Sequence, residues 1–396
     1  MTHDQNAYLE GTTLPLLRHR RWKRSAVGWF VFSTIAATSV GIIPTSLASA
    51  TSSALEFNSP SGLAFGGGHL WVTNEAGNSV SEINPSSGSW ITTLRSSNYG
   101  FNRPTAITRS GADLFIANAV GSVSEIRADN GALVRVISGP QFRFVDPVAI
   151  EATGRTILVL NAGRSNGAGS ITVISTRTGS LVRTVSGSHF AFADPVALAV
   201  SGSNVFVANK GNNSMTEVSI ARGRLVRVVS QQGLSAPDGI AVGAGHVWVS
   251  DSASNAATEI ALATGAVIAT ETDSDGSYGF GSPSAAIGSG ANIFIASPFG
   301  TSPMVTKLSA SNGQPSWYMC NTNGPYYFSL LSAFAVSGSN LWVASQSGAN
   351  SQTPGALTGS LTELSTGDGS LITTLPSATN PAPTTTSTTT TATTLP

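Results

Sequence analysis

Apolar and polar positions follow one repeating pattern between residues 55 and 375. In each copy, a first segment opens with proline and has a small residue two positions later, as after Pro60. A second segment is apolar throughout, as in Leu70-Trp71-Val72, and a third alternates apolar with polar residues, as in Val80-Ser81-Glu82-Ile83. A glycine-containing turn and a fourth short segment complete the copy. This pattern predicts four short β-strands separated by turns.

The four-strand unit occurs seven times, at intervals of roughly 45 residues. The copies open at Pro60, Pro104, Pro147, Pro195, Pro237 and Pro283 and, with leucine in place of proline, at Leu331. One four-stranded sheet cannot bury both of its faces, so each unit needs neighbours on both sides, and closure into a ring protects the sheet edges. We therefore predict an all-β fold, a seven-bladed β-propeller of four-stranded antiparallel blades.

The pattern also predicts how the ring closes. The last fourth strand, at residues 371–375, belongs to its own unit, so we expect no exchange of strands between the two ends. The segment Leu55-Glu56-Phe57 is similar to the linkers that precede the other units. We expect this segment to seal the first blade against the seventh.

Two terminal segments differ from the repeat. Residues 1–50 contain a basic stretch, an apolar stretch at residues 26–43 and the small-residue site Ala48-Ser49-Ala50. They predict a signal peptide, with an uncleaved signal anchor as the alternative. The propeller is therefore assigned to residues 51–377, and we expect the protein to be secreted or held at the cell envelope. Residues 378–396 are rich in threonine and proline, which predicts a disordered tail.

Composition narrows the classes of partner. Lysine plus arginine and aspartate plus glutamate both number 20, so no net charge draws the whole chain to nucleic acid. Cys320 is the single cysteine, which excludes an intramolecular disulfide and a four-cysteine zinc site. We predict no nucleic-acid partner, membrane contact only through an uncleaved N-terminal anchor, and a monomer.

Four of the second strands end in related tetrapeptides. These are Trp71-Val72-Thr73-Asn74, Phe115-Ile116-Ala117-Asn118, Phe206-Val207-Ala208-Asn209 and Trp248-Val249-Ser250-Asp251. With the proline openings, they resemble the YVTN/NHL-type β-propeller superfamily of bacterial exported proteins. The resemblance implies the fold but no single function, because its members include virginiamycin B lyase-like enzymes, metal-dependent lactonases and surface proteins. In those enzymes a divalent metal in the central funnel is held or aided by His, Glu, Asp and Asn side chains. The first strands here offer only the carboxylates of Glu151 and Asp238, without a histidine, which departs from that pattern.

The linkers between units carry paired aromatic residues. The position nearer the following blade is mostly phenylalanine, which favours packing between blades. The farther position varies, and there we expect either packing or a surface ring that stacks on a sugar or a peptide side chain. The candidate binding residues on the face that carries the linkers are Tyr99, Phe142, Phe190, Tyr278 and Tyr326, with His189 and Asp238.

A polar residue ends each of the seven second strands. These residues are Asn74, Asn118, Asn161, Asn209 and Asp251, with serine in the last two units. Their oxygens could bind a cation or a sugar, but such residues commonly cap strand ends, and we favour capping. His69 and His246 precede second strands where Asp or Asn stands in other units, which favours a role in the turn.

Two short motifs resemble functional sites. Glu271, Asp273 and Asp275 are similar to the first half of a calcium loop, but Ser282 at its twelfth position lacks the required carboxylate. We favour a solvated acidic turn over a site for Ca²⁺ or another divalent cation, and predict no cofactor. The string Gly163–Gly167 matches a nucleophile elbow, but no helix follows it, so we interpret it as a chance match.

Charged side chains also flank the hairpin turns of the outer strands. Glu125 with Arg135, and Glu217 with Arg227, are placed almost symmetrically about their turns. We expect surface ion pairs, worth less than about 1 kcal/mol each.

These features favour a non-catalytic scaffold that binds protein or carbohydrate. The alternative is a metal-dependent lyase or lactonase-like hydrolase with its site in the central funnel. At least three converging Asp, Glu, His or Asn side chains in the funnel would distinguish the enzyme, and we predict no such cluster around Glu151 and Asp238.

Overall fold

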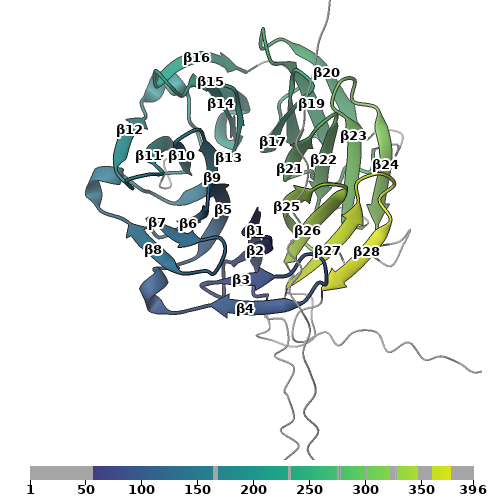
Figure 1. Ribbon diagram of the computed structural model, residues 1–396. Coiled ribbons are helices and arrows are strands. Elements are labelled where there is room, and N and C mark those ends of the chain that lie inside the picture. Colours follow the sequence, from purple (N-terminus) through teal and green to yellow (C-terminus); the bar gives the residue numbers. More distant parts are fainter. Residues whose placement is uncertain are drawn as a thin grey trace, which may run out of the picture. The chain divides into compact units, whose positions relative to one another are not determined.

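Seven four-stranded antiparallel sheets form a ring in the computed structural model (Figure 1). The structure describes residues 57–163, 168–230, 233–273, 276, 278–299, 302–321, 326, 328–346 and 359–375. Each sheet consists of four strands that are consecutive in the chain, so blade 1 contains β1 to β4 and blade 7 contains β25 to β28. The predicted seven-bladed propeller is confirmed. The predicted signal peptide and disordered tail lie outside the described residues.

The strands take the same four places in every blade. The first strands, nearest the axis, are β1 (Pro60–Gly66), β5 (Pro104–Ser110), β9 (Pro147–Thr153), β13 (Pro195–Ser201), β17 (Pro237–Gly243), β21 (Ala286–Ser289) and β25 (Leu331–Ser337). The second are β2 (His69–Asn74), β6 (Asp113–Asn118), β10 (Thr156–Asn161), β14 (Asn204–Asn209), β18 (His246–Asp251), β22 (Asn292–Ser297) and β26 (Asn340–Gln346).

The third and fourth strands lie farther out. The third are β3 (Ser79–Ile83), β7 (Ser122–Arg127), β11 (Ser170–Ser175), β15 (Ser214–Ser219), β19 (Ala256–Ala261), β23 (Met304–Ser309) and β27 (Gly359–Ser365). The fourth are β4 (Trp90–Leu94), β8 (Leu133–Ile137), β12 (Leu181–Val185), β16 (Arg224–Val229), β20 (Val267–Thr272), β24 (Pro315–Cys320) and β28 (Leu371–Leu375). Four 3-10 turns complete the described elements, namely η1 (Ser97–Tyr99), η2 (Pro140–Phe142), η3 (Ser188–Phe190) and η4 (Lys210–Asn212). Among the described residues, no helix has the length and apolar character that a membrane span requires.

The core lies between successive blades. Trp71 of blade 1 is fully buried against Ile107, Leu114 and Ile116 of blade 2. Its indole Nε1 donates to the carbonyl of Ala128 in that blade at 3.2 Å, so the ring is both packed and satisfied. Burial of a large apolar side chain contributes about 1.5–3 kcal/mol, which explains why the second strands are apolar throughout.

Side-chain contacts close the ring between blades 7 and 1. Phe57 is buried in one cluster with Leu70 of blade 1 and Trp342 and Leu375 of blade 7. Ser332 Oγ donates to the carbonyl of Pro60 at 2.6 Å. The prediction that the last fourth strand stays in its own blade is confirmed, and so is the sealing role of Phe57.

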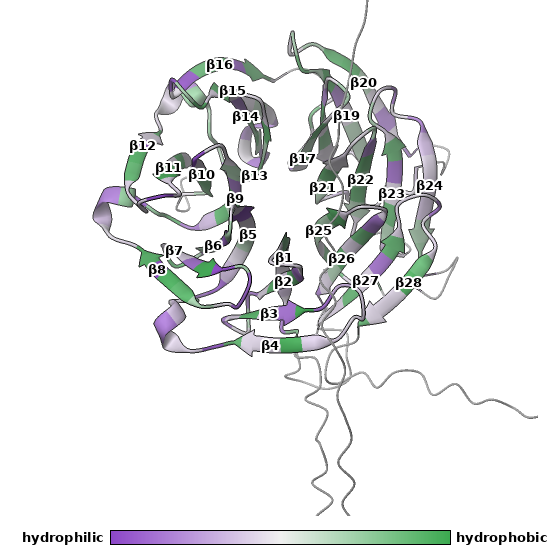
Figure 2. Ribbon diagram, in the orientation of Figure 1, coloured by the Kyte–Doolittle hydropathy of each residue, from purple (hydrophilic) through white to green (hydrophobic). Residues whose placement is uncertain are grey.

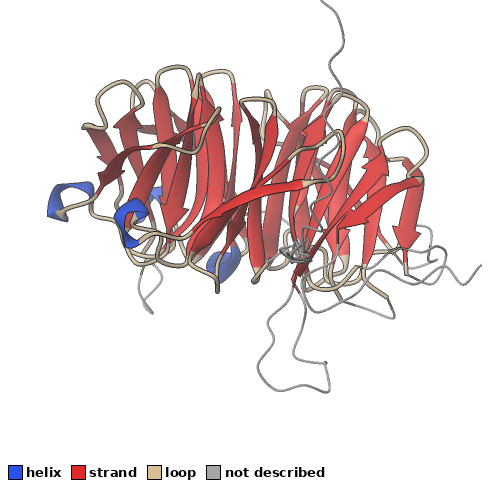
Figure 3. Cartoon of the chain, turned by 60° about the horizontal axis from the view of Figure 1, so that its bottom comes forward, coloured by secondary structure: helices blue, strands red, loops and turns tan. Residues whose placement is uncertain are grey.

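The connections divide between two faces of the ring (Figure 3). Antiparallel pairing places the start of each first strand beside the end of the second, as in Pro60 and Asn74. The linkers between blades therefore share a face with the loops that join second to third strands, and we name it the linker face. The opposite, turn face carries the first-to-second and third-to-fourth turns. Phe57, before β1, and Leu375, at the end of β28, both lie on the linker-face side.

The ion pairs predicted for the outer strands form, but their carboxylates are buried. Glu125 and Glu217 are 0% and 2% exposed, and each carboxylate lies 2.7 Å from the Nε of Arg135 or Arg227 on the neighbouring fourth strand. The pairing across the outer strands is confirmed, but the expectation of solvent-exposed pairs is wrong. Arg227 also donates to the carbonyl of Ala263 in the next blade at 3.0 Å, so that blade covers the pair.

The two histidines beside the first turns have the same kind of partner. His69 Nδ1 lies 2.5 Å from Glu82 Oε1, and His246 contacts Glu259 in the same way. Burial raises the pKa of both glutamates, against the lowering effect of the histidines. Each histidine lies directly after the turn where the sequence placed it, and it also faces a buried acid from the first residue of the second strand.

Candidate functional site

The aromatic pairs of the linkers are stacked and turned inward. The ring centroids of Tyr99 and Phe101 lie 5.2 Å apart, and the other pairs have nearly the same geometry. In η2 and η3 the residue between the two rings has a left-handed backbone, which places both rings on one side of the linker. Phe142, Phe190, Tyr278 and Tyr326 are all buried, and Tyr99 is half-buried.

Burial of these rings agrees with the packing interpretation, and it removes them from the surface on which the alternative placed them. Tyr278 Oη donates to Glu271 Oε2 at 2.5 Å, and Tyr326 Oη donates to the carbonyl of Gly369 in blade 7 at 3.2 Å. Even the hydroxyl ends are therefore used inside the protein. Of the seven candidates, His189 is exposed, and its ring centroid lies 4.1 Å from that of Phe190.

The polar residues that end the second strands form buried networks. The side-chain amide of Asn161 donates to Thr172 Oγ1 at 3.1 Å, and this hydroxyl donates to the linker carbonyl of Phe142 at 2.9 Å. Asn161 Oδ1 in turn accepts the backbone N–H of Val145 at 3.3 Å. Asn74, Asn118 and Asn209 have equivalent amide-to-hydroxyl bonds. These side chains hold the linkers to the blades, as the capping interpretation predicts, although most partners belong to other segments.

Asp251 occupies the same place in blade 5 but has no side-chain N–H group to donate. Its Oδ1 accepts the N–H of Ser235 at 2.9 Å, as Oδ1 of Asn161 accepts the N–H of Val145. Its Oδ2 accepts from Thr258 Oγ1 at 2.7 Å, where an asparagine would donate. Burial raises the pKa of Asp251 to about 7, outweighing the lowering effect of these two bonds.

The wall of the funnel carries two separated carboxylates. Asp238, on β17, accepts from Lys210 Nζ at 2.9 Å. Glu151, on β9, is half-buried, and burial raises its pKa to about 7. Within the described residues, no three His, Cys, Asp or Glu side chains come together as a metal site would require.

The acidic segment after β20 is used within its own linker. Asp273 Oδ1 accepts the N–H groups of Tyr278 and Gly279 at 2.9 and 2.8 Å. Together with the bond from Tyr278 to Glu271, these contacts use the carboxylates of Glu271 and Asp273 within the protein. Asp275, the third candidate, lies outside the described residues, as do residues 164–167 of the elbow-like string.

Two exposed apolar residues on the linker face have no counterpart in the sequence-based candidates. Val120 and Phe299 are 63% and 56% exposed, more than any other large apolar side chain of the described chain. Each is the second residue after a second strand, so they occupy the same position in blades 2 and 6. Other blades have alanine or glycine there, such as Ala253. A comparison of aligned repeats at this one position was the signal that could have found them.

Exposed aliphatic residues also occur on the outer strands (Figure 2). They lie at the second or third place of the fourth strand in most blades, namely Ile91, Val134, Val182, Val226, Ile268 and Ile372. This regular distribution follows from the repeat, because β-branched residues suit strands. Val120 and Phe299 differ because they lie in loops.

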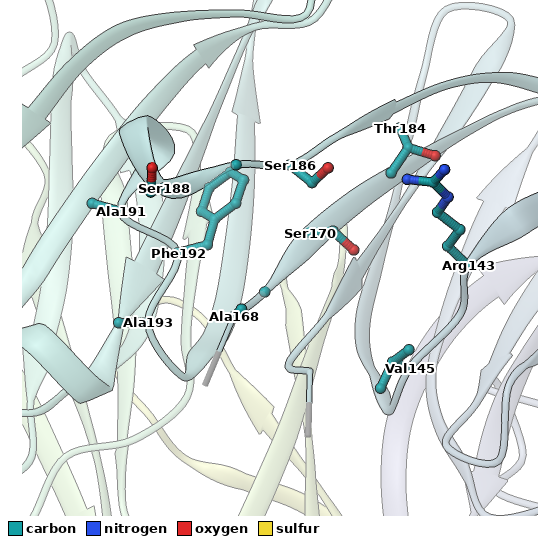
Figure 4. A pocket seen from close by; sticks show the side chains of 12 residues that line it. Arg143, Val145, Ala168, Ser170, Thr184, Ser186, Ser188, Ala191, Phe192 and Ala193 are labelled. Carbon is teal, nitrogen blue, oxygen red and sulfur yellow. The ribbon is translucent and has the colours of Figure 1, made fainter. Parts of the chain in front are cut away.

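A cleft of about 560 Å³ opens on the linker face at blade 3 (Figure 4). Arg143 and Val145 of one linker form one side, and residues 186–193 of the next linker form the other. The beginning of β11 and the end of β12, with Ser170 and Thr184, lie between them. We name this site the blade 3 cleft. A smaller cleft of about 290 Å³, which includes Asp273, occupies a similar place in blade 5.

Comparisons with known proteins agree with this fold. No family model matches the chain, and no curated protein matches it in sequence. Among solved structures, the computationally designed Ika8 protein is 16% identical with a TM-score of 0.58, covering 82% of this chain and 91% of its own. Virginiamycin B lyase from Staphylococcus aureus is 16% identical with a TM-score of 0.56, covering 72% and 90%. A catalytically inactive variant of that lyase with quinupristin is 17% identical with a TM-score of 0.57 and the same coverage.

The architecture and these likenesses define the chain as a seven-bladed β-propeller. At 16–17% identity the likeness concerns the fold alone. The membership of the YVTN/NHL-type superfamily stays a prediction from the tetrapeptides and proline openings.

Proposed function

We propose that this protein is an exported binding scaffold, secreted or held at the cell envelope, that recognises a protein or carbohydrate through its linker face. One observation carries the proposal, namely the exposure of Val120 and Phe299 at one repeat position of that face. Exposed apolar side chains on loops of a rigid scaffold are typical of recognition surfaces, and an aromatic ring can stack on a sugar or an apolar side chain.

The surroundings of the two funnel carboxylates support binding over metal-dependent catalysis. Asp238 is engaged by Lys210, whose positive charge disfavours a cation at that carboxylate. Glu151 lies on β9 of blade 3 and Asp238 on β17 of blade 5, so blade 4 separates the two carboxylates. We expect the purified protein to contain no stoichiometric divalent metal. Elemental analysis that finds one tightly held ion per chain would favour the lyase or lactonase-like alternative.

The linker-face proposal is tested by polar substitution of the two exposed residues. We expect Val120→Ser with Phe299→Ser to reduce binding to arrayed oligosaccharides or cell-surface proteins at least tenfold, with an unchanged melting temperature. Ile268→Ser is the matched control, because Ile268 is 52% exposed but lies on the outer strand β20. Equal loss in the control, or no loss in the double variant, would contradict a role of the linker face.

A further inference from the structure

The blade 3 cleft has the size of a small-molecule site. Its volume of about 560 Å³ lies within the range of about 300–1,000 Å³ that is usual for ligand pockets. Two linkers form opposite walls of the cleft. The beginning of β11 and the end of β12 form the wall between them. A rigid wall of this kind can position a ligand without prior rearrangement.

Arg143 gives the cleft a positive charge that the described protein does not neutralise. It takes part in none of the ion pairs or side-chain hydrogen bonds among the described residues, and it is exposed. Its backbone is left-handed, with a φ of 53°, as it is at Gly100, Ala191 and Gly279 in the equivalent linkers, so this conformation belongs to the linker and is not particular to Arg143. An unpaired guanidinium is suited to a carboxylate, which it can bind with two parallel hydrogen bonds.

Hydroxyl groups line the cleft beside this charge. Thr184, Ser186 and Ser188 come from the end of β12 and the following linker. Ser170 Oγ accepts the side-chain amide of Asn161 at 3.2 Å, so its own proton is available to a ligand. Hydroxyls that both donate and accept are well suited to the hydroxyl groups of a sugar.

Apolar groups complete the lining. Val145 lies beside Arg143, and Ala168, Ala191 and Phe192 lie on the opposite side. A pyranose ring has an apolar face of C–H groups as well as a polar rim, so it matches a wall that carries both kinds of group.

The similar cleft in blade 5 has the opposite charge and a smaller volume. It includes Asp273, whose Oδ1 already accepts two backbone N–H groups of its linker. The repeat architecture therefore does not by itself require a basic cleft, and the charge at blade 3 is a property of Arg143.

We propose that the blade 3 cleft binds an acidic saccharide, with the carboxylate of a uronate residue on Arg143 and sugar hydroxyls on Ser170 and Thr184. The assignment rests on the proposed function, because it takes carbohydrate as a ligand of the linker face. It adds a second site on that face, with its own chemical class of ligand and the residues that contact it.

Calorimetric titration with a galacturonate trimer tests the assignment. We expect binding by the wild-type chain and at least a tenfold weaker affinity in Arg143→Gln, because the charge-assisted pair is lost. Arg155→Gln is the matched control, since Arg155 is an exposed arginine of the same blade in the turn on the opposite face. We expect this control to bind within twofold of wild type, and maltotriose, which has no carboxylate, to bind at least tenfold more weakly than the uronate.

Three results would contradict the uronate assignment. No uronate binding at millimolar concentration, or equal affinity in Arg143→Gln, would overturn the assignment. Inorganic phosphate that binds as tightly as the uronate would show a general anion site and would also overturn it. The double variant Val120→Ser with Phe299→Ser separates the two proposals. It should leave uronate binding at the blade 3 cleft unchanged, and it should weaken the binding of the arrayed ligands that contact Val120 and Phe299.

Discussion

Asp251 shows how one atom can make the stability of a propeller depend on pH. In blade 3 the side-chain amide of Asn161 donates a hydrogen bond to Thr172 Oγ1, and this hydroxyl donates one to the linker carbonyl of Phe142. In blade 5 Thr258 lies within hydrogen-bond distance of both Asp251 Oδ2 and the carbonyl of Gly233, at 2.7 and 3.2 Å, but has a single proton to donate. A protonated Asp251 supplies the missing proton, which agrees with its pKa of about 7.

The sign of the effect follows from the raised pKa. A carboxyl whose pKa is higher in the folded protein stabilises the fold below its unfolded pKa of about 4, and this contribution is lost as the pH rises to and through about 7. We expect Asp251→Asn to match wild type near pH 4–5 and to be more stable at pH 8, by on the order of 1–4 kcal/mol. Urea unfolding at both pH values measures the difference. The prediction fails if the two proteins show the same pH dependence.

Sequence reasoning reached the role of these positions but not their chemistry. The end-of-strand pattern of Asn74 and its equivalents predicted a structural cap. The partners of Asn161 are a third-strand hydroxyl and a linker amide, which only the folded register brings together. The difference between Asn and Asp therefore carries a consequence that the pattern alone does not contain.

At the scale of elements, the outer hairpins are held by buried ion pairs. Arg135 spans from Glu125 in its own blade to the carbonyl of Arg177 in the next, at 2.7 and 3.4 Å. The residue spacing predicted the pair, because both side chains flank one turn. Its burial was missed because the covering group belongs to the following blade, so a local pattern does not reveal it.

This burial gives a prediction about stability. We expect Arg135→Leu to lower the free energy of unfolding by about 3–5 kcal/mol, because it leaves the carboxylate of Glu125 buried without its partner. Arg127→Leu is the control in the same hairpin, since its pair with Asp113 has an arginine that is 50% exposed and should cost less than about 1 kcal/mol. Urea unfolding compares the two. Similar losses in both variants would show that the Glu125 pair is no more buried in effect than a surface pair.

In the linkers, too, the pairing was predictable but the direction of the side chains was not. The aromatic pairing was recognised in the sequence, and packing was one of the two interpretations. The left-handed residue between the rings, such as Ala191, turns both rings toward the blades, and nothing in the spacing of the rings indicates that backbone conformation. Candidate binding residues were consequently placed on side chains that the core uses, whereas the cleft beside Arg143 was not anticipated.

At the scale of the whole molecule, the number and order of blades were predictable because one physical requirement repeats. Each sheet needs a neighbouring sheet on both of its faces, so each copy of the pattern corresponds to one blade. The seam between blades 7 and 1 is the exception, because no linker of the chain joins them. Phe57 and the bond from Ser332 to Pro60 do so instead.

The seam therefore has a predicted weakness. We expect Phe57→Ala to destabilise the protein by about 3–5 kcal/mol and to raise amide hydrogen exchange in β1 and β28 first. Phe101→Ala is the comparison, since Phe101 packs in the equivalent place between blades 1 and 2, where the chain is continuous. Exchange measured by mass spectrometry should remain low in blades 3 and 4 of both variants. A uniform rise in all blades of the Phe57 variant would argue against a local seam.

The shared exit side of Phe57 and Leu375 bears on how the protein is handled at a surface. A tether attached directly at Phe57 or at Leu375 would hold the ring by its linker face, so a biosensor chip loaded that way would shield Val120, Phe299 and the blade 3 cleft. Attachment through an engineered cysteine in a turn of the opposite face, for example at the exposed Arg155, would instead present the linker face to the flowing analyte.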